Sequence, residues 1–199
     1  MKKRMIPIGL LFSALYLVAC GNNETNGSDE GSSGDLSTST TTVDTMNRPA
    51  NNMMAIGDTD RMFIMEAASS GMMEVEAGRL AEQNASNQRV KTFGAMMVRD
   101  HTAANNELMA LATARNVTVP DSLMTKHKQH LDKLRTATGR NFDREYMSMM
   151  NMAHNEDINK FQVAANNAQD TAIRGFATRA LPILRMHKDS AEAINKNMR

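Results

Sequence analysis

The chain has 199 residues, enough for one ordinary domain with a hydrophobic core and too few for two large ones. Hydrophobic residues make up 41% and charged residues 23%, which is typical of a globular protein and excludes a wholly disordered chain. Lys and Arg number 23 against 22 Asp and Glu, and there is no Trp. Neither bulk positive charge nor an aromatic stacking surface is available, so nucleic acid is excluded as a partner.

Residues 1–19 have the features of a secretory signal peptide. The basic residues Lys2–Arg4 precede an apolar run of about fifteen residues, shorter than the roughly 20 needed to span a membrane. The run ends Leu17-Val18-Ala19-Cys20-Gly21, which resembles the bacterial lipobox, where the Cys is acylated and the chain is cut before it. We therefore expect a protein lipid-anchored to the cell envelope through Cys20, on the outer membrane and facing the periplasm.

Residues 20–57 are expected to form the lipidated end and a flexible tether. Gly, Ser, Thr and Asn dominate this segment, which has almost nothing to bury and cannot offset its ordering entropy. The folded domain should then occupy residues 58–199.

Residues 58–199 are predicted to be all-α. They contain no Asn-Gly or Asp-Gly turn and no sustained alternation, and they are rich in good helix formers. Apolar spacing predicts helices over residues 60–85, 87–116, 121–138, 141–168 and from 170 to the C-terminus. The turns at residues 86 and 169 are short, which favours two antiparallel hairpins. We expect a four-helix bundle with an extra, shorter helix linking the pairs.

Each long predicted helix carries one polar residue on its apolar stripe: Glu74, His101, His154 and His187. Glu74 precedes Ser86 by 12 residues and His101 follows it by 15. His154 precedes Gln169 by 15 residues and His187 follows it by 18. At about 1.5 Å per residue, the members of each pair match in height to roughly 5 Å, so all four should meet at mid-bundle.

Three imidazoles and a carboxylate in an apolar core either satisfy one another or hold a ligand, because an isolated buried carboxylate is costly. As metal ligands they would suit one divalent transition metal ion, whether zinc, copper(II), iron(II) or manganese(II). Asp100 and Asp157 lie beside the stripes and would orient the ligands from behind. The alternative is a hydrogen-bonded polar layer that fixes the register of the helices.

Other sites have weaker support. No Glu or Asp is followed three residues later by His, so the Glu-x-x-His pairs of di-iron carboxylate proteins are absent. His127 and His130 lie beside Lys126 and Lys128, which indicates a solvated basic face. The methionines around His154 are expected to be core filler. No catalytic residue is assigned, since the sequence lacks nucleophile-elbow, phosphate-loop and His-Glu-x-x-His motifs.

The folded part resembles a bacterial domain of unknown function described as "predicted outer membrane protein", which is grouped with ferritin-like four-helix bundles. The motifs that carry the resemblance are Met73-Glu74-Val75-Glu76 with Gly78 and Leu80-Ala81, Met97–His101, Gly139–Tyr146, His154, and Ala180–Leu184 with His187. The resemblance implies an envelope lipoprotein or secreted protein of ferritin-like fold with no settled activity. It names no metal and no substrate.

The sequence thus predicts a lipid-anchored envelope protein that binds a metal or small ligand without catalysis, or that has a structural or stress role. One alternative is a mononuclear metal-dependent oxidoreductase that uses the same residues. Another is a pure interaction module with a structural polar layer. The membrane is the one partner indicated, and the sequence names no protein partner.

Overall fold

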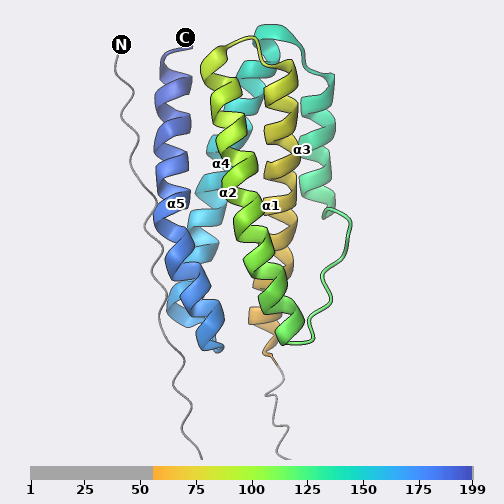
Figure 1. The fold of residues 1–199 in the computed structure, drawn as a ribbon, viewed down its shortest axis with the longest axis vertical. Helices are drawn as coiled ribbons and strands as arrows, with labels where there is room; N and C mark the ends of the chain where they lie inside the picture. The colour runs from red at the N-terminus through yellow and green to blue at the C-terminus, as the bar shows by residue number, and fades with distance from the viewer. Residues whose placement is uncertain (1–55, 199) are drawn as a thin grey trace, which may run out of the picture. The chain divides into compact units, whose positions relative to one another are not determined.

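A computed structural model describes residues 56–198, which form five α-helices and no strand (Figure 1). The helices are α1 (Asp58–Asn84), α2 (Gln88–Ala114), α3 (Thr125–Thr136), α4 (Gly139–Asn167) and α5 (Thr171–Lys196). The expected all-α bundle with a short extra helix is confirmed. The predicted signal peptide, Cys20 and the tether as far as residue 55 lie outside the described residues.

The four long helices form two antiparallel hairpins, α1–α2 and α4–α5, as their short turns predicted (Figure 1). The side chain of Asn87 caps α2 by accepting from the backbone N–H of Arg89, and Asp170 caps α5 by accepting from Ala172 and Ile173. The guanidinium of Arg115, after α2, also donates to Asp170 through two nitrogens, at 2.6 and 2.8 Å. The two hairpins are therefore joined where α2 ends and α5 begins.

Each turn between paired helices is held by a buried aspartate of the other hairpin. Asp60 of α1 accepts the backbone N–H groups of Gln169 and Asp170 at 3.2 and 2.8 Å. Asp143 of α4 accepts those of Ser86 and Asn87 at 2.9 and 3.0 Å. We call these two contacts the aspartate clasps. They satisfy backbone donors that the helix ends leave unpaired, and they fix the height of one hairpin against the other.

The apolar core falls into two clusters separated along the bundle. One contains Met97, Phe142 and Met147, and the other contains Ile64 and Phe176. The histidines predicted as ligands lie between the two clusters. The polar residues therefore form a layer across mid-bundle, as the helix heights predicted.

The helix α3 is shorter than predicted and packs against α1 and α4. It begins at Thr125 because the hydroxyl of Ser69 on α1 accepts the backbone N–H of Met124 at 2.8 Å and so fixes the start of the helix. The same hydroxyl lies 2.7 Å from Nδ1 of His127. The expectation of a solvated face at His127 is wrong, since its side chain turns under α3 and is 3% exposed.

Within residues 56–198, no helix is both long and apolar enough to cross a lipid bilayer.

Candidate metal centre

The four residues predicted from the helical stripes meet in one buried cluster at mid-bundle. Glu74 comes from α1, His101 from α2, His154 from α4 and His187 from α5. Each is at most 6% exposed, and the three imidazole centroids lie 5.3–5.5 Å apart. One nitrogen from each histidine can be chosen so that all three lie within 4.8 Å of one another. The cluster thus gathers one side chain from each long helix.

Two of the histidines have their proton positions fixed by acceptors outside the cluster. Nδ1 of His154 lies 2.9 Å from the carbonyl oxygen of Met150, which can only accept, so this nitrogen carries the hydrogen. Nε2 of His187 lies 2.9 Å from a carboxylate oxygen of Asp100, so it donates in the same way. In the neutral rings the remaining nitrogens, His154 Nε2 and His187 Nδ1, are therefore lone-pair acceptors.

Those two acceptor nitrogens face each other at 3.3 Å. Two lone pairs cannot hydrogen-bond to each other, so the pair needs a cation or a shared proton between them. Nitrogens bound to one tetrahedral ion at about 2.05 Å would lie about 3.3 Å apart. The separation of His154 Nε2 from His187 Nδ1 is thus the one expected of two ligands of such an ion.

Glu74 and His101 carry the unsatisfied polar atoms of the cluster. Oε2 of Glu74 lies 3.0 Å from Nδ1 of His101, and Oε1 lies 3.3 Å from Nδ1 of His154. Neither contact is aligned as a hydrogen bond, and both carboxylate oxygens lack a donor among the described residues. Nε2 of His101 also lacks a partner there. Buried polar atoms are rarely left unpaired, so these three atoms indicate a missing ligand.

Burial keeps the three imidazoles neutral. Desolvation lowers the pKa of His101, His154 and His187 from 6.5 to about 4. Desolvation also raises the pKa of Glu74, against the opposing influence of His154 and Lys160. At neutral pH the histidines therefore present lone pairs rather than positive charge, which is the state that binds metal ions.

The two aspartates predicted to stand behind the ligands differ in their contacts. Asp100 lies against His187 as expected, and Arg99 lowers the pKa of its carboxyl through a hydrogen bond. Asp157 instead accepts a hydrogen bond from Ser70 at 2.7 Å and lies 3.3 Å from the ammonium of Lys160. Burial raises the pKa of Asp157 to about 6, and Glu74 raises it further. Asp100 therefore orients a histidine, whereas Asp157 belongs to a neighbouring polar group.

A cavity of about 50 Å³ lies beside the cluster. Its polar end is formed by Glu74, Asp100, His101, Asp157 and His187. The opposite end is apolar and includes Leu108, Phe161, Phe176 and Leu184. The histidines and the carboxylates therefore border a space rather than a fully packed core.

Sequence reasoning missed the partners that lie next to the cluster. The backbone carbonyl of Met150 has no sequence signature as an acceptor, and Ser70 and Lys160 lie off the stripes that identified the four residues. The buried methionines Met147 and Met150 pack in the core as expected, and Met149 is also buried, at 7% exposure, while Met152 is exposed. His130 lies on α3, outside the cluster.

Three solved structures share this fold. A DUF305 fragment from Deinococcus radiodurans aligns with a TM-score of 0.64 and 9% identity over 71% of this chain and 98% of its own. CopM in the Cu(II)-bound form gives 0.61 and 18% over 70% and 97%, respectively. CopM in the Cu(I)-bound form gives 0.59 and 19% over 69% and 96%. At these identities the similarity establishes a shared helical bundle, in agreement with a ferritin-like fold.

No curated protein matches the sequence. The sequence profile of DUF4142, a domain of unknown function, matches residues 45–194 and so covers nearly all of the bundle. The resemblance to a family of unknown function is confirmed to that extent. The chain belongs to the DUF4142 family.

Proposed function

We propose that this protein binds one transition metal ion at mid-bundle, through His101, His154 and His187 with Glu74 as a fourth ligand. The observation that carries the proposal is the pair of acceptor nitrogens, His154 Nε2 and His187 Nδ1, that face each other at 3.3 Å. The unpaired oxygens of Glu74 and the unpaired Nε2 of His101 supply the remaining ligand atoms. Three imidazoles and a carboxylate suit copper(II), zinc, iron(II) or manganese(II).

Copper is the first ion to test. The CopM structures that share the fold were solved with Cu(II) and Cu(I) bound. Neutral imidazole is a good ligand for copper, and on a common set of ligands copper(II) binds more tightly than the other divalent first-row ions. The role we propose is binding rather than catalysis, because the residues around the ion supply no nucleophile or oxidant of their own.

The test begins with elemental analysis of protein purified without added metal, followed by titration of the metal-free form with copper(II), zinc, iron(II) and manganese(II). A metal that binds only the folded state stabilises it by about 2.7 kcal/mol at a hundredfold excess over the dissociation constant. The thermal midpoint of the wild type should therefore rise clearly with the preferred metal. Alanine at Glu74, His101, His154 or His187 should abolish this rise.

His130→Ala is the matched control, because it removes a histidine from α3, outside the cluster, and should keep the full metal response. If none of the four metals moves the wild-type midpoint, the cluster is a structural polar layer, and the reading as an interaction module replaces the proposal. In that case each alanine variant would still lose about 1–3 kcal/mol, through cavities and unpaired partners. Turnover of an added reductant by the metal-loaded protein would favour the oxidoreductase instead.

We also propose that the bundle works outside the cytoplasm, held at the envelope by lipid on Cys20. The support is the basic start, the short apolar run and the lipobox-like Leu17–Cys20, with Gly21 after the cysteine favouring the outer membrane. Dual acylation gives stable anchoring where a single chain is marginal. The bundle would then bind metal ions in the periplasm.

Cys20→Ser should release the protein from the membrane fraction. Without the thiol no acyl chain can be attached, so the variant should leave the detergent phase in a phase-partition assay and run as an uncleaved precursor. Ser32→Ala, a substitution in the predicted tether, is the control and should partition as the wild type does. Membrane fractionation that is unchanged in the Cys20→Ser variant would exclude the lipid anchor.

A further inference from the structure

We propose that the cavity beside the histidine–glutamate cluster is a second binding site, which takes a small neutral ligand of diatomic size next to the metal ion. This inference rests on the proposed metal binding, because the polar end of the cavity is made by the proposed ligands. It adds an occupant that the metal proposal does not require.

The size of the cavity limits what can enter. It encloses about 50 Å³, whereas one water molecule needs about 10–15 Å³ measured in this way. There is room for about three water molecules, or for a ligand of about two to four non-hydrogen atoms. Amino acids, sugars and nucleotides are therefore too large.

The two ends of the cavity differ in chemistry. Glu74, His101 and His187 border one end, so a ligand there would lie beside the proposed ion. Phe161 and Phe176 close the other end with their rings, whose centroids are 5.8 Å apart. A cavity that is polar only on the metal side suits a molecule that coordinates through one atom and is otherwise apolar.

The charges around the cavity favour a neutral ligand over an anion. Three carboxyl groups line it, on Glu74, Asp100 and Asp157, and none of its lining residues is Lys or Arg. The nearest ammonium, that of Lys160, is already held by Asp157 and by Glu66 at 3.3 and 3.4 Å. An anion would therefore meet carboxylates without a compensating cation other than the ion itself.

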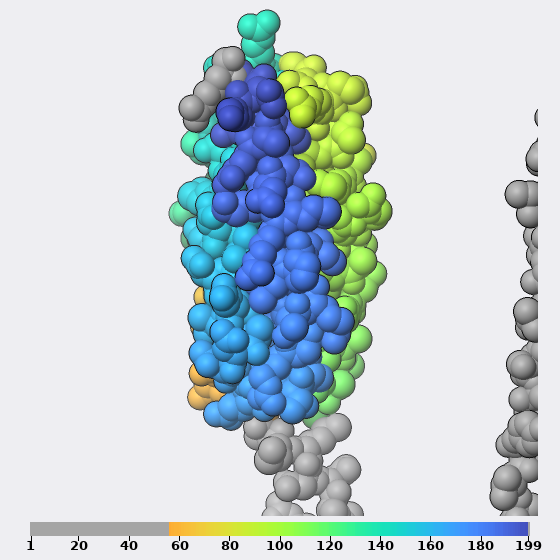
Figure 2. Space-filling model, turned by 90° about the vertical axis from the view of Figure 1, so that its left-hand side faces the viewer, coloured from red at the N-terminus to blue at the C-terminus, as the bar shows by residue number. Residues whose placement is uncertain are grey.

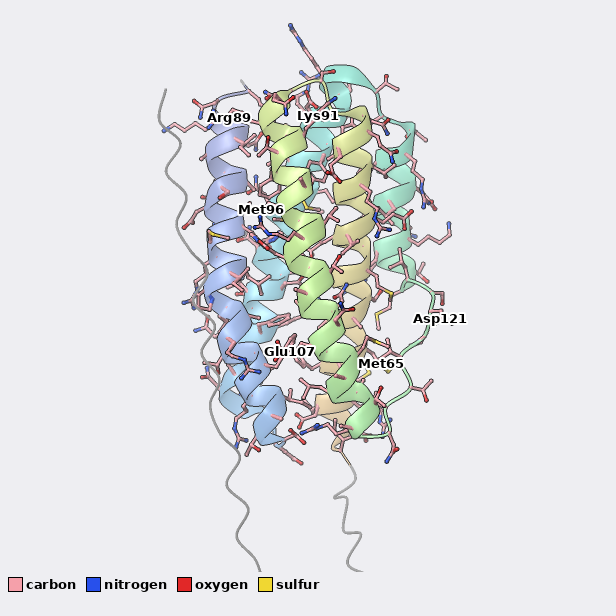
Figure 3. All side chains as sticks on the ribbon, in the orientation of Figure 1. Met65, Arg89, Lys91, Met96, Glu107 and Asp121 are labelled. Carbon is pink, nitrogen blue, oxygen red and sulfur yellow. The ribbon has the colours of Figure 1, made fainter. Side chains whose placement is uncertain are left out.

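The cavity lies on the α2–α5 side of the bundle, where small residues leave it partly open. Ala104 of α2 and Ala180 of α5 line it and are partly exposed, and Ile183 is 47% exposed. Figure 2 shows α5 in front of this seam, with α2 on one side and α4 on the other. Glu107, labelled in Figure 3, extends from α2 toward α5, where it forms an ion pair with Arg179. A small molecule can therefore enter between α2 and α5 without unfolding the bundle.

Carbon monoxide is the probe, since it is neutral, diatomic and binds copper(I). Protein loaded with copper, with its metal content confirmed, is reduced and exposed to carbon monoxide, and the stretching band of the bound gas is recorded. We expect a carbon monoxide band in the wild type. Ala104→Leu fills the cavity from its mouth and should weaken carbon monoxide binding by about tenfold or more while copper content stays unchanged.

Ala103→Leu is the matched control, because Ala103 is the exposed neighbour on the same helix and the variant should bind carbon monoxide as the wild type does. If Ala104→Leu fails to load copper, Ala180→Leu fills the same space from α5 and carries the same expectation. Azide, a linear anion, should leave the electron paramagnetic resonance spectrum of the copper(II) form unchanged.

Copper-loaded protein that forms no carbon monoxide adduct overturns the cavity proposal and leaves the metal site standing. Equal carbon monoxide affinity in the wild type and in both cavity-filling variants overturns it as well, as does an azide-induced change of the copper(II) spectrum. Failure of the wild type to take up copper in the first step is instead a failure of the proposed function with that ion.

Discussion

Lowering the pH from 7 to about 4.5 should destabilise the metal-free bundle by about 3 kcal/mol or more. Burial lowers the pKa of His101, His127, His154 and His187 from 6.5 to about 4. The unfolded chain therefore binds more protons than the folded one between pH 6.5 and 4. The stability due to neutral histidines is complete above pH 6.5 and is lost as the pH falls toward 4.

The buried acids oppose this loss without cancelling it. The pKa of Asp157 is raised to about 6 and that of Glu74 is also raised, so both carboxyl groups favour the folded state once they are protonated. Four histidines outweigh two acids, which sets the sign. Urea denaturation of metal-free protein at several pH values measures the effect, and a free energy of unfolding that stays constant between pH 7 and 4.5 would contradict it.

His127→Asn tests one contribution in isolation, since His127 lies under α3, away from the cluster. Burial lowers the pKa of His127 most, followed by Lys126 and Lys160, while Glu66 opposes them. An asparagine amide can still meet the hydroxyl of Ser69 but does not titrate. The variant should therefore reduce the slope of stability against pH by up to about 1.4 kcal/mol per pH unit.

Asp143→Ala is expected to lower the free energy of unfolding by about 2–4 kcal/mol. The substitution leaves the backbone N–H groups of Ser86 and Asn87 without their acceptor, in a part of the bundle where Asp143 is only 4% exposed. Asp60→Ala removes the equivalent bonds to Gln169 and Asp170 and should cost a similar amount. Chemical denaturation of both variants at neutral pH makes the comparison.

Asparagine provides the matched control for the clasps. Asp143→Asn and Asp60→Asn keep the shape of the side chain and one acceptor oxygen in place of two. Each should fall between the wild type and the corresponding alanine variant. Losses below about 1 kcal/mol in both alanine variants would show that water replaces the carboxylates and that the clasps add little to stability.

The helices and the residues of the cluster were predictable because both depend on periodic patterns. An inward-facing residue repeats every three or four positions, so the stripes that define α2, α4 and α5 also place His101, His154 and His187 inside the bundle. The matching heights of these residues then follow from the short turns. What the pattern cannot encode is any contact that leaves its stripe.

His127 illustrates that limit. Its neighbours Lys126 and Lys128 are exposed, and local charge alone indicates a solvated face. The side chain is buried only because α3 packs on α1 and places His127 against Ser69, 58 residues earlier in the chain. The start of α3 was placed too early for the same reason, since the hydroxyl that fixes it belongs to another helix. The pairing of His187 with Asp100 could be suggested from sequence, but its atoms could not.

The aspartate clasps have a consequence for the origin of the fold. Asp143 follows Asp60 by 83 residues, and the cap Asp170 follows the cap Asn87 by the same 83. The helix ends Asn84 and Asn167 keep this offset, as do Phe93 and Phe176. The two hairpins are thus copies of one helix pair related by internal duplication, and the clasps are one ancestral contact made twice.

The duplication also accounts for the cavity. Glu74 has an acidic counterpart in Asp157, but the positions equivalent to His154 and His187 are Gly71 and Ala104, which both line the cavity. One half of the protein fills these places with imidazole rings, and the other half leaves them nearly empty. Divergence between the copies therefore produced both the histidine cluster and the space beside it, while the clasps kept the scaffold symmetric.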